Sequence, residues 1–492
     1  MDLPLLLDST LTTPLYQQLY EQLRQAILQG RLRSQQRLPS TRSLAKSLGI
    51  SRLTVTQGYD WLLSEGYLET RPGAGTYVCQ ELPDTLLKAS TITSVETAAT
   101  KISLSAYGER VQNAPARLSE TDCDISFRYG RPALDLFPTE VWRTLLSRHC
   151  RAEGQTWMDY APSAMGYAPL RAAIAAYLGK FRAVQCQPEQ ILITNGTQQA
   201  LELIVRLLVN PTDGIAMEDP GYLGARSIFQ ASGAEVLAVP CDRDGLVVDN
   251  LSTYTAHPRL VYLTPSHQFP TGALLSLPRR LALLKWAHAT GALIIEDDYD
   301  SEYRYSGRPI PALQGLDTQQ SVLYIGTFSK VMFPSLRIGY LVLPPALVTV
   351  FSKAKGLADR QSPSLTQCAL ADFIHEGHLE RHIRRMRTVY ARRRQALVKA
   401  LYHYFGDTVE ILGDSAGLHI MARLSLSLDD NDAISKAQTV GVAMFSARPQ
   451  YWQPMRHGEF VFGYAELDEA TLIEGVRRVA TVVQRPTPLT EL

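Results

Sequence analysis

From about residue 123 onwards, short apolar stretches of strand length alternate with longer stretches of helical spacing. The apolar stretches are residues 191–193, 260–263, 293–295 and 322–325, and the helical ones include 198–209 and 278–289. Strands that alternate with helices predict parallel strands joined by crossover helices, with a ligand site at the carboxyl ends of the strands. A chain of 492 residues is also too long for one ordinary core, so we expect two or three domains.

A lysine follows the last of these strands, in the run Gly326-Thr327-Phe328-Ser329-Lys330, and the acidic run 296–298 lies about thirty positions earlier. This arrangement suits a pyridoxal 5'-phosphate (PLP) cofactor held as a Schiff base on Lys330. Asp297 would pair with the pyridinium nitrogen, and hydroxyl groups such as that of Thr327 would take phosphate oxygens. Tyr299 could donate to the ring oxygen, and the guanidinium fork of Arg337 suits phosphate.

The turn that contains Gly196, Thr197 and Gln198 lies between a strand and a long helix, so its amides predict an anion cradle. Tyr222, after another strand, is a candidate for stacking on the cofactor ring. Each residue alone has an ordinary explanation, such as a helix cap, a core aromatic or a surface lysine. Their order on successive strand ends favours the cofactor site.

The first eighty residues have a different pattern. Apolar residues at helical spacing predict helices over 15–29, from Ser40 to Gly49 and from Ser51 to Gly66. Two helices across a tight turn form a helix-turn-helix. Residues 67–70 and 76–78 then predict a two-stranded wing.

This region is expected to bind double-stranded operator DNA. Residues 14–78 carry eight Lys or Arg against four Asp or Glu, although the whole chain has a formal net charge of only +1. The first turn of a recognition helix reads base edges in the major groove, while flanking groups contact phosphate. The candidate DNA-binding residues are Arg42, Ser51, Arg52, Thr54, Thr56, Arg71, Gly73 and Gly75.

Composition excludes several classes of protein. The six cysteines are scattered without a C-x-x-C pair, which argues against a zinc site or a disulfide scaffold, and we expect no metal. No apolar run approaches the ~20 residues that span a bilayer, and the start of the chain does not read as a secretory signal. The protein is expected to be cytoplasmic, with no membrane partner.

Residues 80–122 are rich in Thr, Ser and Ala and show no sustained periodicity. We interpret them as a linker of roughly forty residues, which would span up to ~130 Å when extended. The expected domains are therefore a DNA-binding domain over 10–79, this linker, and an effector and dimerisation domain over 123–485.

The N-terminal region closely resembles the winged helix of the GntR family of bacterial regulators. The shared patterns are L-P-S-T-R-S-L-A-K-S-L-G-I-S-R-L-T-V (38–55), E-G-Y-L (65–68) and R-P-G-A-G-T-Y-V (71–78). The resemblance implies DNA binding through the residues named above.

The remainder resembles fold-type I aminotransferases, and both halves together resemble the MocR/GabR subfamily of GntR regulators. The patterns that carry the likeness are G-T-Q-Q-A-L (196–201), E-D-P-G-Y (218–222), T-P-S-H-Q-F-P-T-G (264–272), E-D-D-Y-D-S-E-Y-R-Y (296–305), G-T-F-S-K (326–330), F-P-S-L-R-I-G-Y (333–340) and the arginine-rich run 384–394. The resemblance implies a mostly parallel, seven-stranded type of sheet flanked by helices, with a smaller α+β subdomain. It also implies a homodimer, for which the linker would allow a domain-swapped, head-to-tail arrangement.

One departure bears on chemistry. Typical aminotransferases have Asn-Pro before Thr-Gly, whereas this chain has Gln268-Phe269-Pro270, a change that the subfamily shares and that weakens the case for efficient turnover. Arg448 lies where related chains place an arginine that binds the substrate carboxylate, so it is a candidate effector-binding residue.

Three functions stay open. The favoured one is a transcriptional regulator that senses an amine or amino acid by exchange at Lys330. The alternatives are a working aminotransferase with an accessory DNA-binding module, and a regulator of vitamin B6 synthesis that senses PLP itself. Whether the chain is an enzyme is left uncertain.

Overall fold

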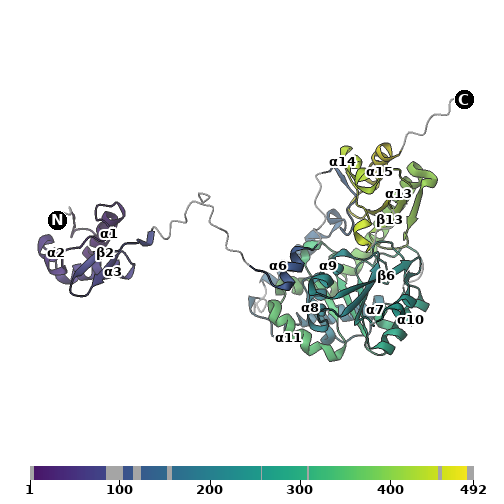
Figure 1. Ribbon diagram of the computed structural model, residues 1–492, viewed down its shortest axis with the longest axis horizontal. Helices are drawn as coiled ribbons and strands as arrows, with labels where there is room; N and C mark the ends of the chain where they lie inside the picture. The colour runs from purple at the N-terminus through teal and green to yellow at the C-terminus, as the bar shows by residue number, and fades with distance from the viewer. Residues whose placement is uncertain are drawn as a thin grey trace. The chain divides into compact units, whose positions relative to one another are not determined.

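A computed structural model of the chain describes residues 5–84, 103–114, 123–151, 158–255, 257–306, 310–452 and 457–484. These residues form two compact units that divide after Ile102 (Figure 1). Each unit has a hydrophobic core of its own. No helix among the described residues is both long and apolar enough to cross a membrane.

The N-terminal unit is a winged helix-turn-helix, as the sequence predicts. Its elements are α1 (Leu15–Leu28), α2 (Thr41–Leu48), α3 (Arg52–Ser64) and the antiparallel strands β1 (Leu68–Arg71) and β2 (Gly75–Val78). Ser40 and Ser51 cap the second and third helices by accepting from Ser43 N and Thr54 N, each at 3.1 Å. Leu19, Leu23, Val55, Leu62 and Val78 are fully buried between the helices and the wing.

The second unit, called the body here, is built on a large sheet. The strands are β4 (Ile191–Thr194), β5 (Gly214–Asp219), β6 (Glu235–Asp242), β7 (Gly245–Leu246), β8 (Leu260–Leu263), β9 (Leu293–Asp298), β10 (Val322–Thr327) and β11 (Gly339–Val342). Their order is β4-β11-β10-β9-β8-β5-β6-β7. Neighbours pair in parallel except where β11 or the two-residue β7 takes part. The expected mostly parallel sheet of seven strands is confirmed, with β7 as a short addition at its edge.

Helices cover both faces of this sheet, as Figure 1 shows. They are α6 (Thr139–Arg151), α7 (Ala168–Arg182), α8 (Thr197–Leu208), α9 (Leu223–Ser232), α10 (Leu277–Thr290), α11 (Val348–Asp359) and α12 (Ser364–His375). All six residues of β10 are buried, which is why that strand reads as a continuous apolar run instead of an alternating one.

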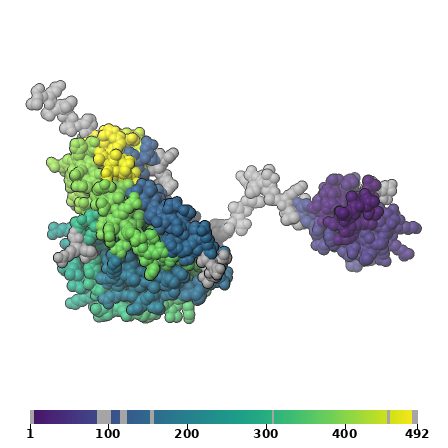
Figure 2. Space-filling view, turned by 180° about the vertical axis from the view of Figure 1, so that it is seen from behind, coloured from purple at the N-terminus to yellow at the C-terminus, as the bar shows by residue number. Residues whose placement is uncertain are grey.

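A smaller subdomain completes the body. It contains α13 (His378–Phe405), β12 (Val409–Leu412), β13 (His419–Leu424), α14 (Asp430–Thr439), β14 (Val442–Ala443), β15 (Glu459–Gly463) and α15 (Glu469–Val483). Strands β12, β13 and β15 form an antiparallel sheet, while β14 pairs in parallel with β3 (Ile125–Ser126). Helix α15, yellow in Figure 2, packs against the green helix α13. The expected α+β subdomain is confirmed.

The segment interpreted as a linker contains a helix that the sequence analysis did not predict. Helix α5 (Ala106–Gln112) is capped by Ser105, and Arg110 donates from Nε to the carbonyl oxygen of Ala231 at the end of α9, at 2.8 Å. Residues 103–114 therefore belong to the body, and the unit boundary falls after Ile102. A seven-residue helix spans two turns, which is too short to show periodicity. The other parts of the expected linker, 85–102 and 115–122, lie outside the described residues.

Candidate functional site

A cavity of about 300 Å³ opens at the carboxyl ends of the parallel strands. It is where the strand-helix alternation predicts a ligand site. Most of the residues proposed from sequence to bind a cofactor line it: Thr197, Gln198, Tyr222, Asp297, Tyr299, Thr327, Lys330 and Arg337. The structure thus brings together side chains from segments that are up to 140 positions apart in the sequence.

Lys330 follows β10 and its Nζ donates to the carbonyl oxygen of Gly130 at 2.8 Å. Burial lowers the pKa of the Lys330 ammonium, so more of the side chain is an uncharged, nucleophilic amine than in a free lysine. Gly130 has a φ of +80°, and a Cβ at that position would lie 2.8 Å from Nζ. The left-handed φ at position 130 therefore favours glycine, and a side chain there would also displace the lysine Nζ.

Asp297, at the end of β9, has one partnered and one unpartnered oxygen. Its Oδ2 accepts from the hydroxyl of Tyr262 at 2.8 Å, while Oδ1 is buried and has no hydrogen-bond partner among the described residues. Burial raises the pKa of this carboxyl group to about 7. A buried oxygen without a donor, on the wall of a cavity that also holds Lys330, fits the protonated ring nitrogen of PLP.

The opposite end of the cavity has the features of a phosphate cradle. Helix α8 begins at Thr197 after Gly196, whose φ is +87°. Arg337 Nη2 donates to Asn195 O at 2.6 Å, and a Cβ on Gly196 would lie 3.0 Å from that same nitrogen. Free amides at a helix N-terminus together with a guanidinium group suit a phosphate dianion. Gly196 thus shapes the cradle without lining the cavity itself.

Two tyrosines stand at the sides of the cavity. Gln198 Nε2 donates to the hydroxyl of Tyr222 at 3.0 Å, which fixes the ring at the start of α9. The hydroxyl of Tyr299 donates to the carbonyl oxygen of His267 at 2.9 Å and lies 3.0 Å from His267 Nδ1. Tyr299 is therefore held by His267, and a bond from its proton to the ring oxygen of the cofactor would replace that contact.

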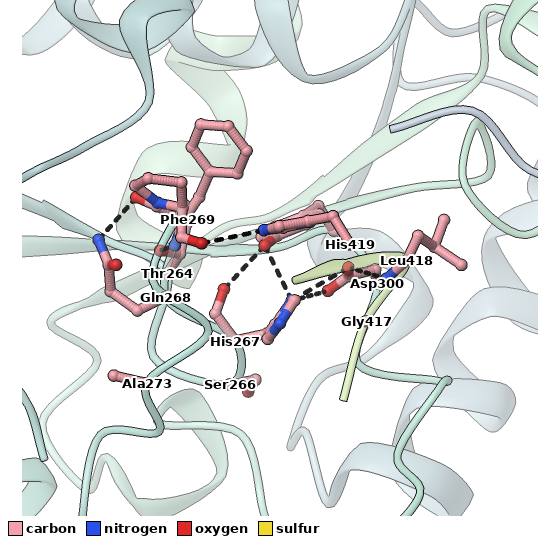
Figure 3. A network of polar contacts seen from close by, with 12 residues as sticks. Thr264, Ser266, His267, Gln268, Phe269, Ala273, Asp300, Gly417, Leu418 and His419 are labelled. Carbon is pink, nitrogen blue, oxygen red and sulfur yellow. Dashed lines mark hydrogen bonds and ion pairs between the residues drawn. The ribbon is translucent and has the colours of Figure 1, made fainter. Parts of the chain in front are cut away.

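A buried network beside Tyr299 was missed by the sequence analysis (Figure 3). His267 Nδ1 lies 3.0 Å from Asp300 Oδ1, and Asp300 Oδ2 accepts from Leu418 N of the smaller subdomain at 3.2 Å. His419 Nε2 lies 3.2 Å from Pro270 O, and burial lowers the pKa of His419 well below its ordinary value. These three side chains could in principle ligate a metal, but hydrogen bonds already occupy the facing atoms of His267 and Asp300.

The departure at residues 268–270 has a clear structural result. Phe269 is 7% exposed and its ring lines the cavity. Gln268 turns away, because its Nε2 donates to Pro220 O at 2.7 Å and its Oε1 accepts from Thr271 Oγ1 at 2.6 Å. No amide therefore faces the cavity from this pair of residues.

Arg448 is not brought into the site. It is exposed, begins a single 3-10 turn (Arg448–Gln450), and lies outside the cavity lining. The buried member of this turn is Gln450, which donates from Nε2 to the hydroxyl of Tyr129 at 3.3 Å and accepts from Leu223 N at 3.2 Å. Sequence spacing does not reveal which residue of such a turn points inward.

In the winged helix, the predicted DNA-binding side chains are on the surface. Arg42, Ser51 and Arg52 are exposed, while Thr54 and Thr56 are half-buried on the first two turns of α3. They contribute little to the core, so the surface that they form is available to a ligand.

The wing has a more constrained geometry. Arg71 donates from Nε to Glu69 Oε1 at 2.9 Å and its guanidinium carbon lies 4.5 Å from the centre of the Tyr77 ring. Gly73 and Gly75 have φ values of +74° and +113°. A Cβ at Gly75 would lie 2.9 Å from Arg37 Nε, so this glycine is also required by packing inside the unit.

Comparison with known proteins agrees with both halves. The family of bacterial regulatory proteins of the gntR type matches residues 15–78, and the aminotransferase class I and II family matches residues 127–479. The chain is 40% identical to the probable rhizopine catabolism regulatory protein MocR of Rhizobium meliloti, over 96% of this chain and 94% of that protein. It is 34% identical to the pyridoxine biosynthesis regulator PdxR of Corynebacterium glutamicum, over 96% of each.

Solved structures agree with the fold of the body. The α-aminoadipate aminotransferase LysN of Thermus thermophilus, solved with N-(5'-phosphopyridoxyl)-L-leucine, is 31% identical and superposes with a TM-score of 0.68 over 77% of this chain and 95% of LysN. The kynurenine aminotransferase of Pyrococcus horikoshii, solved with PMP, is 28% identical with a TM-score of 0.68 over 80% of this chain and 98% of that enzyme. A gntR-type winged helix and a PLP-binding aminotransferase body thus lie on one chain, which belongs to the MocR/GabR subfamily of GntR-family transcriptional regulators.

Proposed function

We propose that the winged helix reads a double-stranded operator and that the PLP-loaded body senses a small amine or amino acid by exchange at Lys330. The observation that carries this proposal is the cavity lined by both the half-buried Lys330 and Asp297, whose Oδ1 is unpartnered among the described residues, on a chain that also has a DNA-binding unit. A PLP aldehyde bonded to a lysine exchanges that bond for one to a small amine.

The residues of the chain divide the work of holding the cofactor. Arg337 and the start of α8 hold the phosphate, and Asp297 pairs with the ring nitrogen. Lys330 supplies the amine, whose pKa is lowered by burial. Gly130 O accepts from Nζ at 2.8 Å and so keeps the amine near the cavity before and after exchange.

Two features favour sensing over turnover. Phe269 gives the cavity an apolar wall where typical aminotransferases present an asparagine amide, so a polar contact to the ring is absent from this pair of residues. The intact winged helix gives the chain a function other than catalysis, namely operator binding. A ligand changes operator affinity only if it binds two conformations of the protein with different affinities.

One observation supports the alternative of a working enzyme. The chain is 32% identical to the 2-aminoadipate transaminase of Thermus thermophilus over 75% of this chain. A multiple-turnover assay with amino donors and keto acids separates the two functions. We expect at most a single half-reaction per PLP, and sustained keto-acid production at ordinary enzyme rates would show that the body is an enzyme.

The effector is proposed to be an amine, and its second contact depends on Arg448. The exposed position of Arg448 means that a bond to an effector carboxylate would require the 448–450 turn to move. A titration of the PLP-loaded protein with GABA, taurine, β-alanine, D-alanine and common α-amino acids identifies the effector by its shift of the cofactor absorption. An unchanged response in Arg448→Ala would remove the arginine from the effector site and favour the alternative in which PLP itself is sensed to control vitamin B6 synthesis; the relative PdxR is named as a regulator of pyridoxine biosynthesis.

We further propose a homodimer with two winged helices reading two half-sites, in a head-to-tail, domain-swapped form. Because α5 packs on the body, the chain between Asp84 and Ser103 spans at most roughly 60 Å, less than half the reach of the forty-residue linker. A monomer at micromolar concentration in small-angle scattering would contradict the dimer.

A further inference from the structure

A second cavity, of about 400 Å³, lies in the body between α7, the segment after β9 and α13. It shares no lining residue with the cofactor cavity. Its charged lining residues are Arg182, Arg304, Arg384, Arg387, Glu302 and Glu380. Tyr177, Phe181 and Ile383 add an apolar wall.

Arg304 is the unusual member of this lining. Among the described residues, its side chain has no ion pair or hydrogen-bond partner, and its Nε is buried. Burial lowers the pKa of the guanidinium group, and the charge of Arg182 lowers it further. The backbone of Arg304 is fixed by an antiparallel bridge to Ala416. A fixed, partly buried cation without a counterion is costly, and an anionic ligand would offset that cost.

The other arginines leave positive charge in excess. Arg387 donates from Nε and Nη2 only to the backbone carbonyl of Glu302, at 3.1 and 2.8 Å, so no carboxylate neutralises it among the described residues. Arg384 pairs with Glu380 at 3.1 Å, but Glu380 also pairs with Lys180 at 3.0 Å. One carboxylate thus serves two cations at the rim.

Glu302 is the acid that could oppose an anion in this cavity. Burial raises its pKa to about 7, and the nearby charge of Asp298 raises it further, whereas Arg182 lowers it. The hydroxyl of Tyr177 lies 3.2 Å from Glu302 Oε1. Asp300 also contributes to the raised pKa. Near neutral pH much of Glu302 is therefore uncharged, and the protonated carboxyl group can donate to an anion.

We propose that this cavity is a second ligand site, which binds a small molecule bearing an oxyanion, either a phosphate ester or a carboxylate, through Arg304 and Arg387. A guanidinium fork presents paired donors to such oxygens. The cavity is enclosed on two sides by helices and has an aromatic wall, which suits a small molecule better than a long polyanion.

The site also has a direct connection to the cofactor. Arg182 donates to Asp298 Oδ2 and to Ser266 Oγ, each at 2.7 Å. Asp298 follows Asp297, and Ser266 precedes His267, which holds Tyr299. A ligand that shifts Arg182 would therefore also shift Asp298 and Ser266, and with them the neighbouring Asp297 and His267. This inference does not depend on which amine, if any, reacts at Lys330.

Sulfate is a suitable probe because it stays a dianion from pH 5.5 to 8.5. The full-length protein, loaded with PLP and free of DNA and amines, is titrated with sulfate by calorimetry at constant ionic strength. PLP occupies the Arg337 cradle, so that site does not contribute. We expect saturable binding, weakened about tenfold or more in Arg304→Gln, as loss of a hydrogen bond to a charged group implies. Arg385→Gln, an exposed arginine of α13 outside the cavity, should bind like wild type.

The pH dependence gives a second readout. Sulfate affinity should fall as pH rises through about 7, and Glu302→Gln should remove that dependence while keeping binding at pH 8. Comparison of glycerol phosphate with succinate then identifies which oxyanion class binds more tightly. Each variant must retain the PLP absorption of the wild type, which shows that the body is folded.

Three outcomes would overturn the proposal. The first is no saturable sulfate binding to the PLP-loaded wild type. The second is equal weakening in Arg304→Gln and Arg385→Gln, which would indicate general surface charge. The third is an Arg304→Gln variant that binds operator DNA less tightly but sulfate normally, which would place Arg304 on a nucleic-acid surface. None of these outcomes bears on amine sensing at Lys330, so the two proposals fail separately.

Discussion

The winged helix and the body place their functional side chains in opposite environments. In the winged helix Arg42 and Arg52, which we propose to contact DNA, are exposed, and the core is a separate set of apolar side chains. In the body Asp297 is buried and Lys330 is half-buried, and loss of water moves the pKa values of both. Substitution of a functional side chain should therefore leave the stability of the winged helix unchanged, whereas in the body it should change both function and stability. Substitutions should reveal this difference.

The largest effect is expected from Lys330→Ala. This change removes the amine that holds PLP, so the yellow colour, and the adduct that borohydride fixes, should be lost completely. Basal operator binding should be largely unchanged, because the residues proposed to contact DNA belong to the other unit. Absorption spectra after dialysis and a gel-shift assay measure the two effects. Colour that survives denaturation and dialysis of the variant would show that another group holds the cofactor.

The next effect concerns the cost of burying Asp297. Its folded pKa of about 7 lies above the ordinary value near 4, so the folded state binds the proton more tightly than the unfolded state. The stabilisation from that proton is complete below about pH 4 and is lost as pH rises through 7. For the cofactor-free protein, Asp297→Asn should therefore become more stable than wild type with rising pH, by on the order of 4 kcal/mol in total.

Denaturant unfolding of the body at pH 5 and pH 8, without PLP, should detect roughly 2–3 kcal/mol of this total, because pH 5 already lies above the unfolded-state pKa. Buried acids whose charged neighbours are other residues, such as Glu302 beside Asp298, titrate in both proteins and cancel. With PLP present, the wild type should be the more stable of the two proteins. Asp297→Asn cannot hold a negative charge beside the ring nitrogen, so it should bind the cofactor less tightly. A stability difference that does not vary with pH would mean that Asp297 is ionised in the empty protein.

The same contrast explains how much could be predicted from the sequence. Lys330, Asp297 and Thr197 follow or precede apolar strands, so their place at one edge of a parallel sheet was predictable. The pairing of His267 with Asp300 was not, although both lie within quoted patterns, because it depends on the packing of two loops. Nor was the contact of Asp300 with Leu418, which joins two subdomains across 118 positions.

Short or irregular segments account for the other differences. Helix α5 has only seven residues, so no periodicity marks it, and Ser105 is its one local signal. Arg448 lies in a 3-10 turn, where neither period two nor period 3.6 applies, so its exposed position could not be derived from spacing. In the winged helix, by contrast, α1 and α3 span 14 and 13 residues, long enough for apolar residues to recur at helical spacing, and Ser40 and Ser51 mark where α2 and α3 begin.

A smaller effect is expected from Arg52→Ala on the DNA surface. Arg52 is exposed and its Nε donates to Thr41 Oγ1 at 3.3 Å, a weak surface contact, so its removal should leave the melting temperature unchanged. Loss of a contact to a base edge should weaken operator binding by about 1–3 kcal/mol and relax specificity at one position. Lys46→Ala, an exposed cation on α2, is the matched control. Equal losses in both variants would indicate phosphate contacts only.

The smallest effects test whether the two units unfold independently. Ser40 caps α2 of the winged helix through Ser43 N, and Asp468 caps α15 of the body through Thr471 N at 2.7 Å. Removal of a cap by alanine costs about 1 kcal/mol in either case. Because the units have separate cores, Ser40→Ala should lower only the unfolding transition reported by Trp61, the one tryptophan of the N-terminal unit, whose ring loses its contacts with Tyr16 and Tyr20. Asp468→Ala should lower only the transition that releases PLP. A single transition that both substitutions shift equally would show that the units are energetically coupled.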